Sequence, residues 1–272
     1  MRAVNPASQV VAVSGKDRGA VMMGGHNTTL TMWWDGKSFR SYAGSEAAVP
    51  KGAALVNSRA KAAIDKPAPA KLPAMCASHS RAVSIGGDAT VGTLQQRKAG
   101  DARAFRASGE FDALTMDLAL AAFGEKKLGK GAATDVLAIS LSATDYIGHT
   151  FGTAGAETCT QMAALDATLG RMFAALDKSK VPYVVMLTAD HGGHDTNHIG
   201  TLIEDFRITW IAHGPGIIPQ EIDLTLYTFD TAPTVAYALG LPLKLDEWDG
   251  ITVYKIFGED QIKVHDKYPC KT

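Results

Sequence analysis

The hydrophobic positions in the first part of this chain fall into short runs of strand length. Such runs occur at Val10–Ser14 and at residues 20–23, on either side of the polar stretch GKDRG, and TTLTMWWDG ends a third run in an Asp-Gly turn. A helix-compatible segment then continues to about Asp65, and the proline-rich stretch KPAPAKLPAM interrupts it as a loop. The pattern therefore predicts strands followed by one helix.

The rest of the chain alternates between helical and strand-like patterns. Residues 110–123 have apolar positions at helical spacing and lead into the apolar run DVLAISLS. Residues 157–178 predict a long helix, because its apolar side chains recur every three or four residues: Met162, Leu165, Leu169, Met172 and Leu176. VPYVVMLTADHGG and FRITWIAHGPG predict two more strands, and TFDTAPTVAYALG predicts a helix that begins at Asp230 or Thr231 and ends at Gly240. This alternation predicts a mainly parallel α/β sheet.

Composition and charge narrow the class of protein. The chain has 272 residues, 46% of them hydrophobic, and a formal net charge of -1, which does not favour nucleic acid polymers or anionic membranes as partners. No apolar run is long enough for a membrane-spanning helix, and the opening MRAVNPASQVVAVSG lacks the regions of a secretory signal. Three widely spaced cysteines (Cys76, Cys159 and Cys270) allow one disulfide and leave the redox compartment open.

Two segments place an aspartate and a histidine directly after a predicted strand. Asp145 and His149 follow VLAISLSAT, and Asp190 and His191 follow YVVMLTA. Because ligands gather where parallel strands end, we expect both pairs at one edge of the sheet. Either pair alone is more often a solvated loop or a helix cap. Together they favour a metal centre, since carboxylate oxygen and imidazole nitrogen suit zinc, manganese or iron.

Three further histidines are candidates for an additional metal ligand. His198 is preferred because it closely follows the second Asp-His pair, whereas His194 either supports a ligand or is exposed. His213, at the end of the predicted strand in WIAHGPG, could compete as a ligand, but its position is more typical of a structural histidine.

The stretch SGKDRG suggests an anion site. Lys16 and Arg18 are two residues apart, so on extended backbone their side chains project to the same side. Paired cations suit a tetrahedral oxyanion such as phosphate, because arginine can bind two oxygens at once and lysine adds a point charge. Spacing alone, however, favours a solvated turn in which Asp17 balances the charge.

Several of these stretches together resemble a known family. The chain resembles the single-subunit bacterial alkaline phosphatases that use a threonine nucleophile, a branch of the alkaline phosphatase superfamily. Five stretches occur in the order that this branch uses: SGKDRGA, FRASGEFDALTMDLAL, LGKGAATDVLAISLSATDYIGHTFG, ALDATLGRMFAALD and LTADHGG. The C-terminal stretch is more similar to the nucleotide pyrophosphatase and phosphodiesterase members. The resemblance implies a three-layer α/β sandwich with a mainly parallel central sheet. We expect a single domain over residues 1–272, with a small cap-like subregion at about 24–105.

The resemblance also implies a two-metal site. Asp145 and His149 would bind one zinc ion, with His198 as its further histidine, and Asp190 and His191 would bind the other. Zinc is the expected ion, and manganese is the alternative. The expected partners are small phosphorylated substrates.

By the same resemblance, Lys16 and Arg18 would contact the phosphoryl oxygens, which is linked in this branch to hydrolysis of phosphate monoesters. Two alternatives stay open: a type I phosphodiesterase or nucleotide pyrophosphatase of the same superfamily, and a catalytically inactive metal-binding remnant. Relatives of this type imply a periplasmic or secreted location.

The start of the chain departs from the superfamily pattern. The superfamily has its first metal-binding aspartate and its serine or threonine nucleophile upstream of the SGKDR stretch, but only fifteen residues precede Lys16 and none of them is aspartate. We therefore expect that the sheet lacks its N-terminal strands, and that the nucleophile lies on a missing N-terminal segment or a partner chain. The chain alone is expected to have little or no activity.

Overall fold

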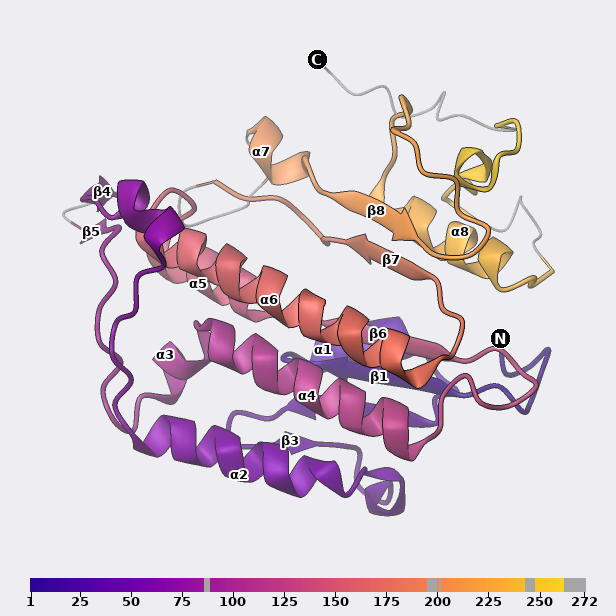
Figure 1. Ribbon diagram of the computed structural model, residues 1–272, viewed down its shortest axis with the longest axis horizontal. Coiled ribbons are helices and arrows are strands. Elements are labelled where there is room, and N and C mark those ends of the chain that lie inside the picture. Colours follow the sequence, from indigo (N-terminus) through magenta and orange to yellow (C-terminus); the bar gives the residue numbers. More distant parts are fainter. Residues whose placement is uncertain (86–88, 195–199, 201, 243–247, 262–272) are drawn as a thin grey trace.

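The structure is a computed structural model, and it describes residues 1–85, 89–194, 200, 202–242 and 248–261. Its centre is a four-stranded sheet with the strand order β3-β2-β1-β6 (Figure 1). The bounds of these strands are Phe39–Arg40 for β3, Leu30–Trp34 for β2, Val10–Ser14 for β1 and Val136–Ser140 for β6. β1 is parallel to both β2 and β6, whereas β3 is antiparallel to β2. Ser14 lies beside Ser140 in the register, so β1 and β6 end at the same edge.

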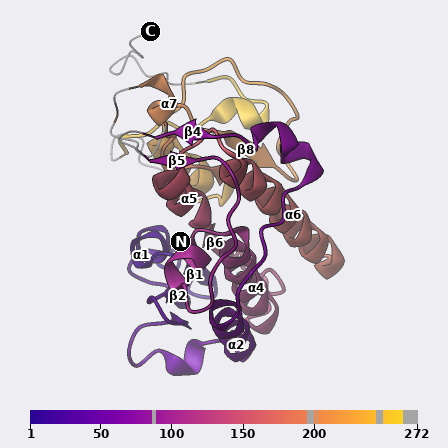
Figure 2. The ribbon, with the colours of Figure 1, turned by 90° about the vertical axis from the view of Figure 1, so that its left-hand side faces the viewer.

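Helices cover both faces of this sheet, and the predicted three-layer α/β fold is confirmed (Figure 2). On one face lies α1 (Asp17–Gly24). On the other lie α2 (Gly52–Asp65), α4 (Gly109–Glu125) and α6 (Ala156–Ser179). The remaining helices and strands are β4 (Val83–Ser84), β5 (Thr90–Val91), α3 (Ala102–Arg106), α5 (Ala143–Phe151), β7 (Val185–Thr188), α7 (Ile203–Phe206), β8 (Trp210–His213) and α8 (Thr231–Ala238). Turns of 3-10 helix are η1 (Glu46–Ala48), η2 (Ala74–His79), η3 (Thr228–Asp230) and η4 (Tyr254–Phe257).

Alternation along β1 explains why both faces are covered. Successive strand residues face opposite sides, so Val11 and Val13 join the core under α2 and α4. Ala12 and Ser14 face α1, where Gly24 and Gly19 let the helix backbone come close to the strand. Aromatic rings complete the core: the ring of Phe111 lies 5.7 Å from that of Trp34.

The apolar run at residues 20–23 was predicted to be a strand, and this is wrong, because the run lies in α1. A run of four residues is too short for its period to separate strand from helix. The expectation that Lys16 and Arg18 lie on extended backbone is also wrong, because α1 begins between them. Lys16 is the extended residue before the helix (φ -131°, ψ 140°), whereas Arg18 is within the first helical turn.

The predicted apolar stripe of the long helix is only partly buried. Met172 and Leu176 form a second core cluster with Met116 of α4, and Leu169 packs against it. Met162, nearer the N-terminus of α6, is exposed. The predicted bounds of the last helix agree with the structure, in which Asp230 precedes α8 and Gly240 has a φ of 63°.

The strand of residues 185–188 was expected in the parallel sheet, and within the described residues it is not hydrogen-bonded there. β7 pairs antiparallel with β8 in a separate two-stranded sheet. The outer edge of β6 is correspondingly unpaired in the part of the chain that the structure describes. The Val136 N–H donates to Gln9 and the Ser140 carbonyl accepts from Gly15, both toward β1, so the backbone groups of Leu137 and Ile139 point away from β1.

The segment at about 24–105, expected to be a cap-like subregion, has two parts. Its first half contributes β2, β3 and α2 to the central sheet and its covering layer. The excursion is confined to roughly residues 66–101, which include η2 and the β4–β5 hairpin. A disulfide between Cys76 and Cys159 ties this excursion to α6.

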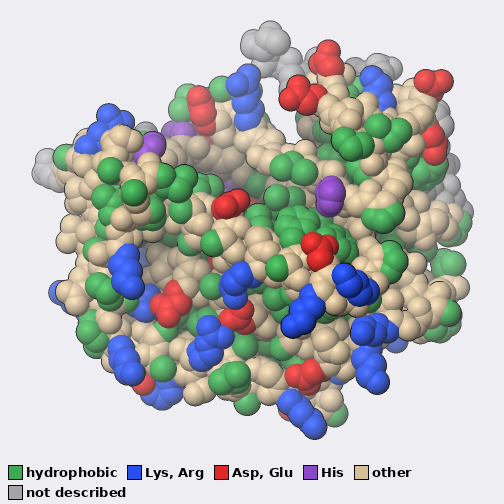
Figure 3. Space-filling model, viewed as in Figure 1, with side chains coloured by type: hydrophobic (Ala, Val, Ile, Leu, Met, Phe, Trp, Pro, Cys, Tyr) green, Lys and Arg blue, Asp and Glu red, His purple; other side chains and the backbone are tan. Residues whose placement is uncertain are grey.

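The surface in the view of Figure 1 carries charges of both signs. Basic and acidic side chains are interspersed over the face formed by α2, α4 and α6 (Figure 3). Asp117 of α4, for example, accepts hydrogen bonds from Arg59 of α2 and Arg171 of α6, each at 2.6 Å. Among the described residues, no helix has both the length and the apolar character needed to cross a membrane.

Candidate metal and phosphate site

The candidate site forms where β1 and β6 end. The chain leaves β1 through Gly15 to Lys16, and it leaves β6 through a short turn into α5, whose first turn carries Asp145. Because the two strands are adjacent and parallel, these exits are neighbours. The Lys16 ammonium donates a hydrogen bond to Oδ2 of Asp145. The structure thus brings the predicted lysine and the first predicted metal-binding aspartate into direct contact.

Two imidazoles converge on the other oxygen of the same carboxylate. His149 lies one helical turn beyond Asp145, and its Nε2 is 3.3 Å from Asp145 Oδ1. The Nε2 of His191, which follows β7, is 3.7 Å from that same oxygen. The side chain of Asp190 is 90% exposed, with Oδ2 3.7 Å from His191 Nε2. Four of the five predicted metal ligands therefore form one continuous cluster.

The donor set of this cluster suits a metal ion in part. Donors that share a tetrahedral zinc ion at about 2.0–2.2 Å from it lie about 3.3–3.6 Å from each other. The 3.3 Å separation of His149 Nε2 and Asp145 Oδ1 falls in this range, and His191 Nε2 is slightly beyond it, at 3.7 Å from the same oxygen. Within the described residues, however, no three His, Cys, Asp or Glu side chains are already arranged to hold an ion. The cluster is a partial donor set.

The environment keeps Asp145 ionised. Desolvation of its partly buried carboxyl raises its pKa, but the hydrogen bond and charge of Lys16 oppose this, with smaller contributions from His149 and His191. The balance holds the pKa of Asp145 below its ordinary value. An ionised carboxylate is the form that accepts a cation.

The loop after β7 is fastened to α7. The backbone N–H groups of Gly192 and Gly193 donate to the carbonyls of Asp205 and Glu204, each at 2.9 Å. A Cβ at Gly192 would lie 1.8 Å from the Glu204 carbonyl oxygen, so only glycine allows this close approach. His194 Nδ1 is 2.7 Å from Oδ1 of the buried Asp205. His194 is thus neither exposed nor part of the donor cluster.

The other two candidate histidines lie outside the cluster. His198 lies outside the described residues, so its predicted role as a ligand stays a prediction. His213 pairs with Val185 at the beginning of β7, whereas Asp190 follows the end of that strand. Its ring packs edge-on against Phe173, with 6.3 Å between centroids. His213 is thus an exposed residue that lies away from the Asp145 cluster, and its structural role stays a prediction.

Arg18 and Lys16, predicted as a pair, have different environments. The Lys16 side chain is 16% exposed and its ammonium lies 4.7 Å from the centroid of the Tyr146 ring. Arg18 is exposed, and no hydrogen bond or ion pair holds its guanidinium among the residues described. Asp17 accepts a hydrogen bond from the Arg18 backbone N–H rather than neutralising its side chain.

A buried carboxylate that sequence analysis missed orients α5. Asp112 of α4 has no exposed surface and accepts hydrogen bonds from the backbone N–H of Ala143 at 2.9 Å and from Nε2 of Gln161 at 2.8 Å. Ala143 is the first residue of α5, so Asp112 binds the helix that carries Asp145. Burial raises the pKa of Asp112 to about 6, despite the lowering effect of these hydrogen bonds. The only signal in the sequence was an acidic residue within the apolar stretch EFDALT.

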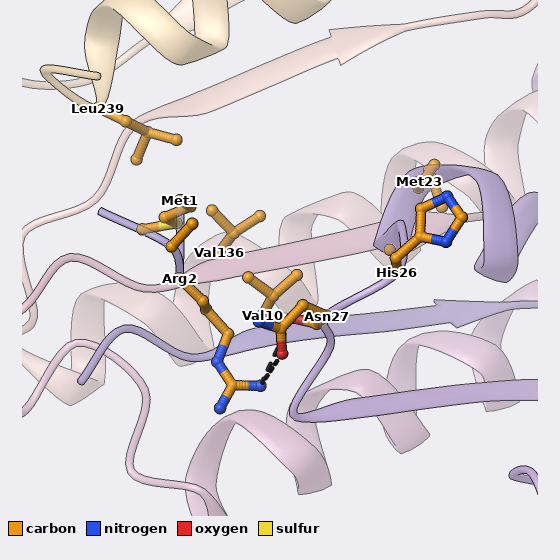
Figure 4. A pocket seen from close by; sticks show the side chains of 10 residues that line it. Met1, Arg2, Val10, Met23, His26, Asn27, Val136 and Leu239 are labelled. Carbon is orange, nitrogen blue, oxygen red and sulfur yellow. Dashed lines mark hydrogen bonds between the residues drawn. The ribbon is translucent and has the colours of Figure 1, made fainter. Parts of the chain in front are cut away.

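Two cavities of the described structure lie away from the cluster. The first, about 370 Å³, is at the opposite end of β1 and β6, where Val10 and Val136 line it together with Arg2 and Asn27 (Figure 4). The second, about 670 Å³, lies between the β2–β3 turn and α2. Neither is lined by Asp145 or Lys16.

The structure has a mainly parallel sheet between helical layers, with one Asp-His pair after β6 of that sheet and a second pair after β7. This arrangement is similar to that of the alkaline phosphatase superfamily of phosphoric ester hydrolases. The chain belongs to the type I phosphodiesterase / nucleotide pyrophosphatase family, whose model matches residues 9–218. The predicted superfamily is therefore confirmed.

Relatives of this chain carry the name alkaline phosphatase. It is 44% identical over 252 residues to alkaline phosphatase PhoK of Sphingomonas sp, covering 91% of this chain and 42% of PhoK. It is 43% identical over 196 residues to alkaline phosphatase PhoD of Zymomonas mobilis subsp. mobilis, covering 72% of this chain and 34% of PhoD. The crystal structure of wild-type alkaline phosphatase PafA is similar with a TM-score of 0.59 and 29% identity, over 71% of this chain and 40% of PafA. The chain thus spans between about a third and two fifths of the length of these relatives.

Proposed function

We propose that this chain carries part of a zinc-dependent active site that hydrolyses phosphate monoesters of small molecules. The observation that carries the proposal is the convergence of Lys16, His149 and His191 on the two oxygens of Asp145. A carboxylate with two imidazoles is a donor set for zinc, and a lysine beside it supplies charge for an oxyanion. The names of the relatives support phosphatase chemistry.

In the proposed site, Asp145 and His149 hold the first zinc ion and His191 and Asp190 contribute to the second. Bound zinc would polarise the phosphoryl oxygens and lower the pKa of a bound water molecule. Lys16 is fixed beside Asp145 by its hydrogen bond, so its charge is already positioned when a phosphate dianion arrives. Zinc is preferred to manganese because two imidazole nitrogens meet one carboxylate oxygen, whereas oxygen-rich sites favour manganese.

We further propose that the nucleophile comes from a segment that adds a strand to the open edge of β6, either from an N-terminal extension or from a partner chain. The described serine at the end of β1 is a poor candidate, because Ser14 Oγ accepts the Lys16 N–H at 3.0 Å and faces α1. The backbone groups of Leu137 and Ile139 are oriented to pair with an added strand. Brisk, saturable hydrolysis of p-nitrophenyl phosphate by the chain with added zinc would refute this second proposal.

A diesterase is the second candidate, favoured by the description of the matching family. A phosphate monoester is a dianion at neutral pH and a diester is a monoanion, so the Lys16 charge favours the monoester. Binding discriminates the two candidates without requiring turnover. Titration calorimetry of the zinc-loaded chain with orthophosphate and with dimethyl phosphate measures this preference directly.

The matched control for Lys16 is Lys37, an exposed lysine in the β2–β3 turn. We expect zinc-dependent orthophosphate binding, weaker binding of dimethyl phosphate, and a loss of about tenfold or more in orthophosphate affinity for Lys16→Met. Lys37→Met should bind as the unaltered chain does. Equal affinities for the two Lys variants, or preference for dimethyl phosphate, would contradict the monoester proposal.

The proposed location is periplasmic or secreted. The disulfide between Cys76 and Cys159 supports it, because disulfides persist in oxidising compartments. Labelling of free thiols in protein taken from its native cells tests this: both cysteines should be unreactive without a reductant. Full labelling of both would contradict it.

A further inference from the structure

One cation beside the site has no role in the proposed reaction. Arg106, the last residue of α3, has its guanidinium carbon 5.0 Å from the centroid of the Tyr146 ring. Among the residues that the structure describes, Arg106 makes no side-chain hydrogen bond and no ion pair. Its nitrogen atoms are not among the buried unpartnered ones, so solvent or a ligand can reach them. A half-buried arginine with five unused donors is suited to bind an anion.

The position of Arg106 is fixed by its neighbours. Phe105, the preceding residue, is fully buried and its ring lies 5.5 Å from that of Phe111. Asp101 caps α3 by accepting the Ala104 N–H at 2.8 Å. Ser108 closes the other end, with its hydroxyl donating to the Phe105 carbonyl at 2.6 Å. The guanidinium is therefore presented from an anchored turn rather than from a loose loop.

Arg106 and Lys16 share one aromatic neighbour. The Lys16 ammonium is 4.7 Å from the Tyr146 centroid and the Arg106 guanidinium carbon is 5.0 Å from it, so the two cations are no more than about 10 Å apart. Lys16 is also hydrogen-bonded to Asp145, so the Tyr146 ring and Lys16 link Arg106 to the donor cluster. Lys16 is paired with Asp145, whereas the Tyr146 ring is the one side-chain partner of the Arg106 guanidinium within the described ranges. The two cations thus suit two different anionic groups of one molecule.

We propose that Arg106 forms a second anion subsite, which binds a carboxylate or phosphate on the alcohol part of the substrate. The substrate class is then phosphate monoesters that carry another anionic group within a few bonds of the reacting phosphate. Arginine binds such planar or tetrahedral anions through two parallel hydrogen bonds. This inference rests on the proposed phosphatase site, because Lys16 and the zinc ions are taken to bind the reacting phosphate.

The test compares two non-identical monoesters with the same phosphate group: 2-phosphoglycolate, which carries a carboxylate, and ethyl phosphate, which does not. Titration calorimetry of the zinc-loaded chain measures both affinities for the unaltered protein, Arg106→Gln and Arg103→Gln. Arg103 is the matched control, because it is an exposed arginine on the same short helix and its removal changes the net charge equally.

We expect 2-phosphoglycolate to bind about tenfold or more tightly than ethyl phosphate, and Arg106→Gln to abolish most of this preference. Arg106→Lys should recover part of it, because the charge returns without the two-pronged geometry. Arg103→Gln should leave both affinities within about twofold of the unaltered chain. Circular dichroism of each variant checks that the fold is retained.

The outcomes separate this inference from the proposed function. If neither ester binds, or if Lys16→Met leaves ethyl phosphate binding unchanged, the phosphate site itself is wrong. If ethyl phosphate binding depends on Lys16 but Arg106→Gln keeps the preference for 2-phosphoglycolate, only the second subsite is overturned. An equal effect of Arg103→Gln and Arg106→Gln would also overturn it, because long-range charge would then explain the preference.

Discussion

Replacement of Asp112 by asparagine tests what it costs to bury a charged carboxylate against the helix that carries Asp145. Burial raises the pKa of Asp112 from 3.8 to about 6. That difference corresponds to about 3 kcal/mol of cost for the charged carboxylate in the folded state. The unfolded chain loses the Asp112 proton near its ordinary pKa and the folded chain loses it near 6. The stabilising contribution is therefore complete well below pH 3.8, declines as the pH rises above that value, and is lost once the pH has passed through 6.

Asparagine keeps the acceptor for the Ala143 N–H and has no charge. Its amide N–H groups can donate to Gln161, whose Oε1 is now buried without a partner, once the Gln161 amide turns over. We compare the free energy of unfolding of the unaltered chain with that of Asp112→Asn. This difference should fall by about 2.5 kcal/mol between pH 4 and pH 8, with about 1 kcal/mol of the fall complete by pH 5. Other carboxyl groups titrate equally in both proteins and cancel in the difference.

Urea unfolding of both proteins across this pH range measures the difference. A third variant, Asp112→Ala, leaves the Ala143 N–H without its acceptor and should be less stable than Asp112→Asn at every pH, by about 1–3 kcal/mol. If the stability curves of the unaltered chain and Asp112→Asn run parallel from pH 4 to pH 8, the pKa of Asp112 is not raised by folding.

Three further predictions concern the framework of the site. Cys76→Ser should lower the free energy of unfolding by about 4–5 kcal/mol, because the disulfide closes a loop with a sequence separation of 83. A reductant should bring the unaltered chain to the same urea midpoint as this variant. A midpoint that does not change in either case would contradict the prediction. Asp205→Ala removes the acceptor of the Gly200 N–H and the partner of His194. Hydrogen exchange of backbone amides in the loop after β7 should therefore accelerate, whereas the amides of α4 should stay protected. Unchanged exchange in that loop would contradict the prediction. Gly15→Ala places a Cβ 2.6 Å from Phe111, so it should cost about 1–3 kcal/mol in thermal unfolding, and a cost near zero would show that the turn relaxes freely.

Sequence patterning predicted the helices and strands that have long, regular periods. The helix at 157–178 and the strand before Asp145 lie where their patterns placed them, and the common edge of β1 and β6 follows from the expected parallel sheet. The short run at 20–23 failed, because four apolar residues fit either period. The sequence also could not predict which strands pair. β7 is apolar enough for a parallel sheet, but among the described strands it pairs with β8 in an antiparallel arrangement.

The residues of the candidate site also differ in whether the sequence alone could identify them. Asp145, His149 and His191 could be predicted because their residue types and strand-end positions carry the chemistry. Arg106 could not, since its place beside Tyr146 depends on how α3 packs rather than on any spacing in the chain. The role of Asp112 could not be predicted either, because its hydrogen-bond partners belong to α5 and α6, which lie far from it in the sequence.

In the proposed site, Asp145 and His149 hold one zinc ion, and His191 lies beside them as a ligand of the second. Zinc titration of the purified chain by calorimetry, with His149→Ala and the matched control His213→Ala, tests this arrangement most directly. We expect His149→Ala to weaken zinc binding by at least about tenfold. His213→Ala should bind zinc as the unaltered chain does, because His213 pairs with the beginning of β7 and Asp190 follows its end. Zinc affinity that is the same in all three proteins, or that depends on His213 instead, would contradict the proposed site.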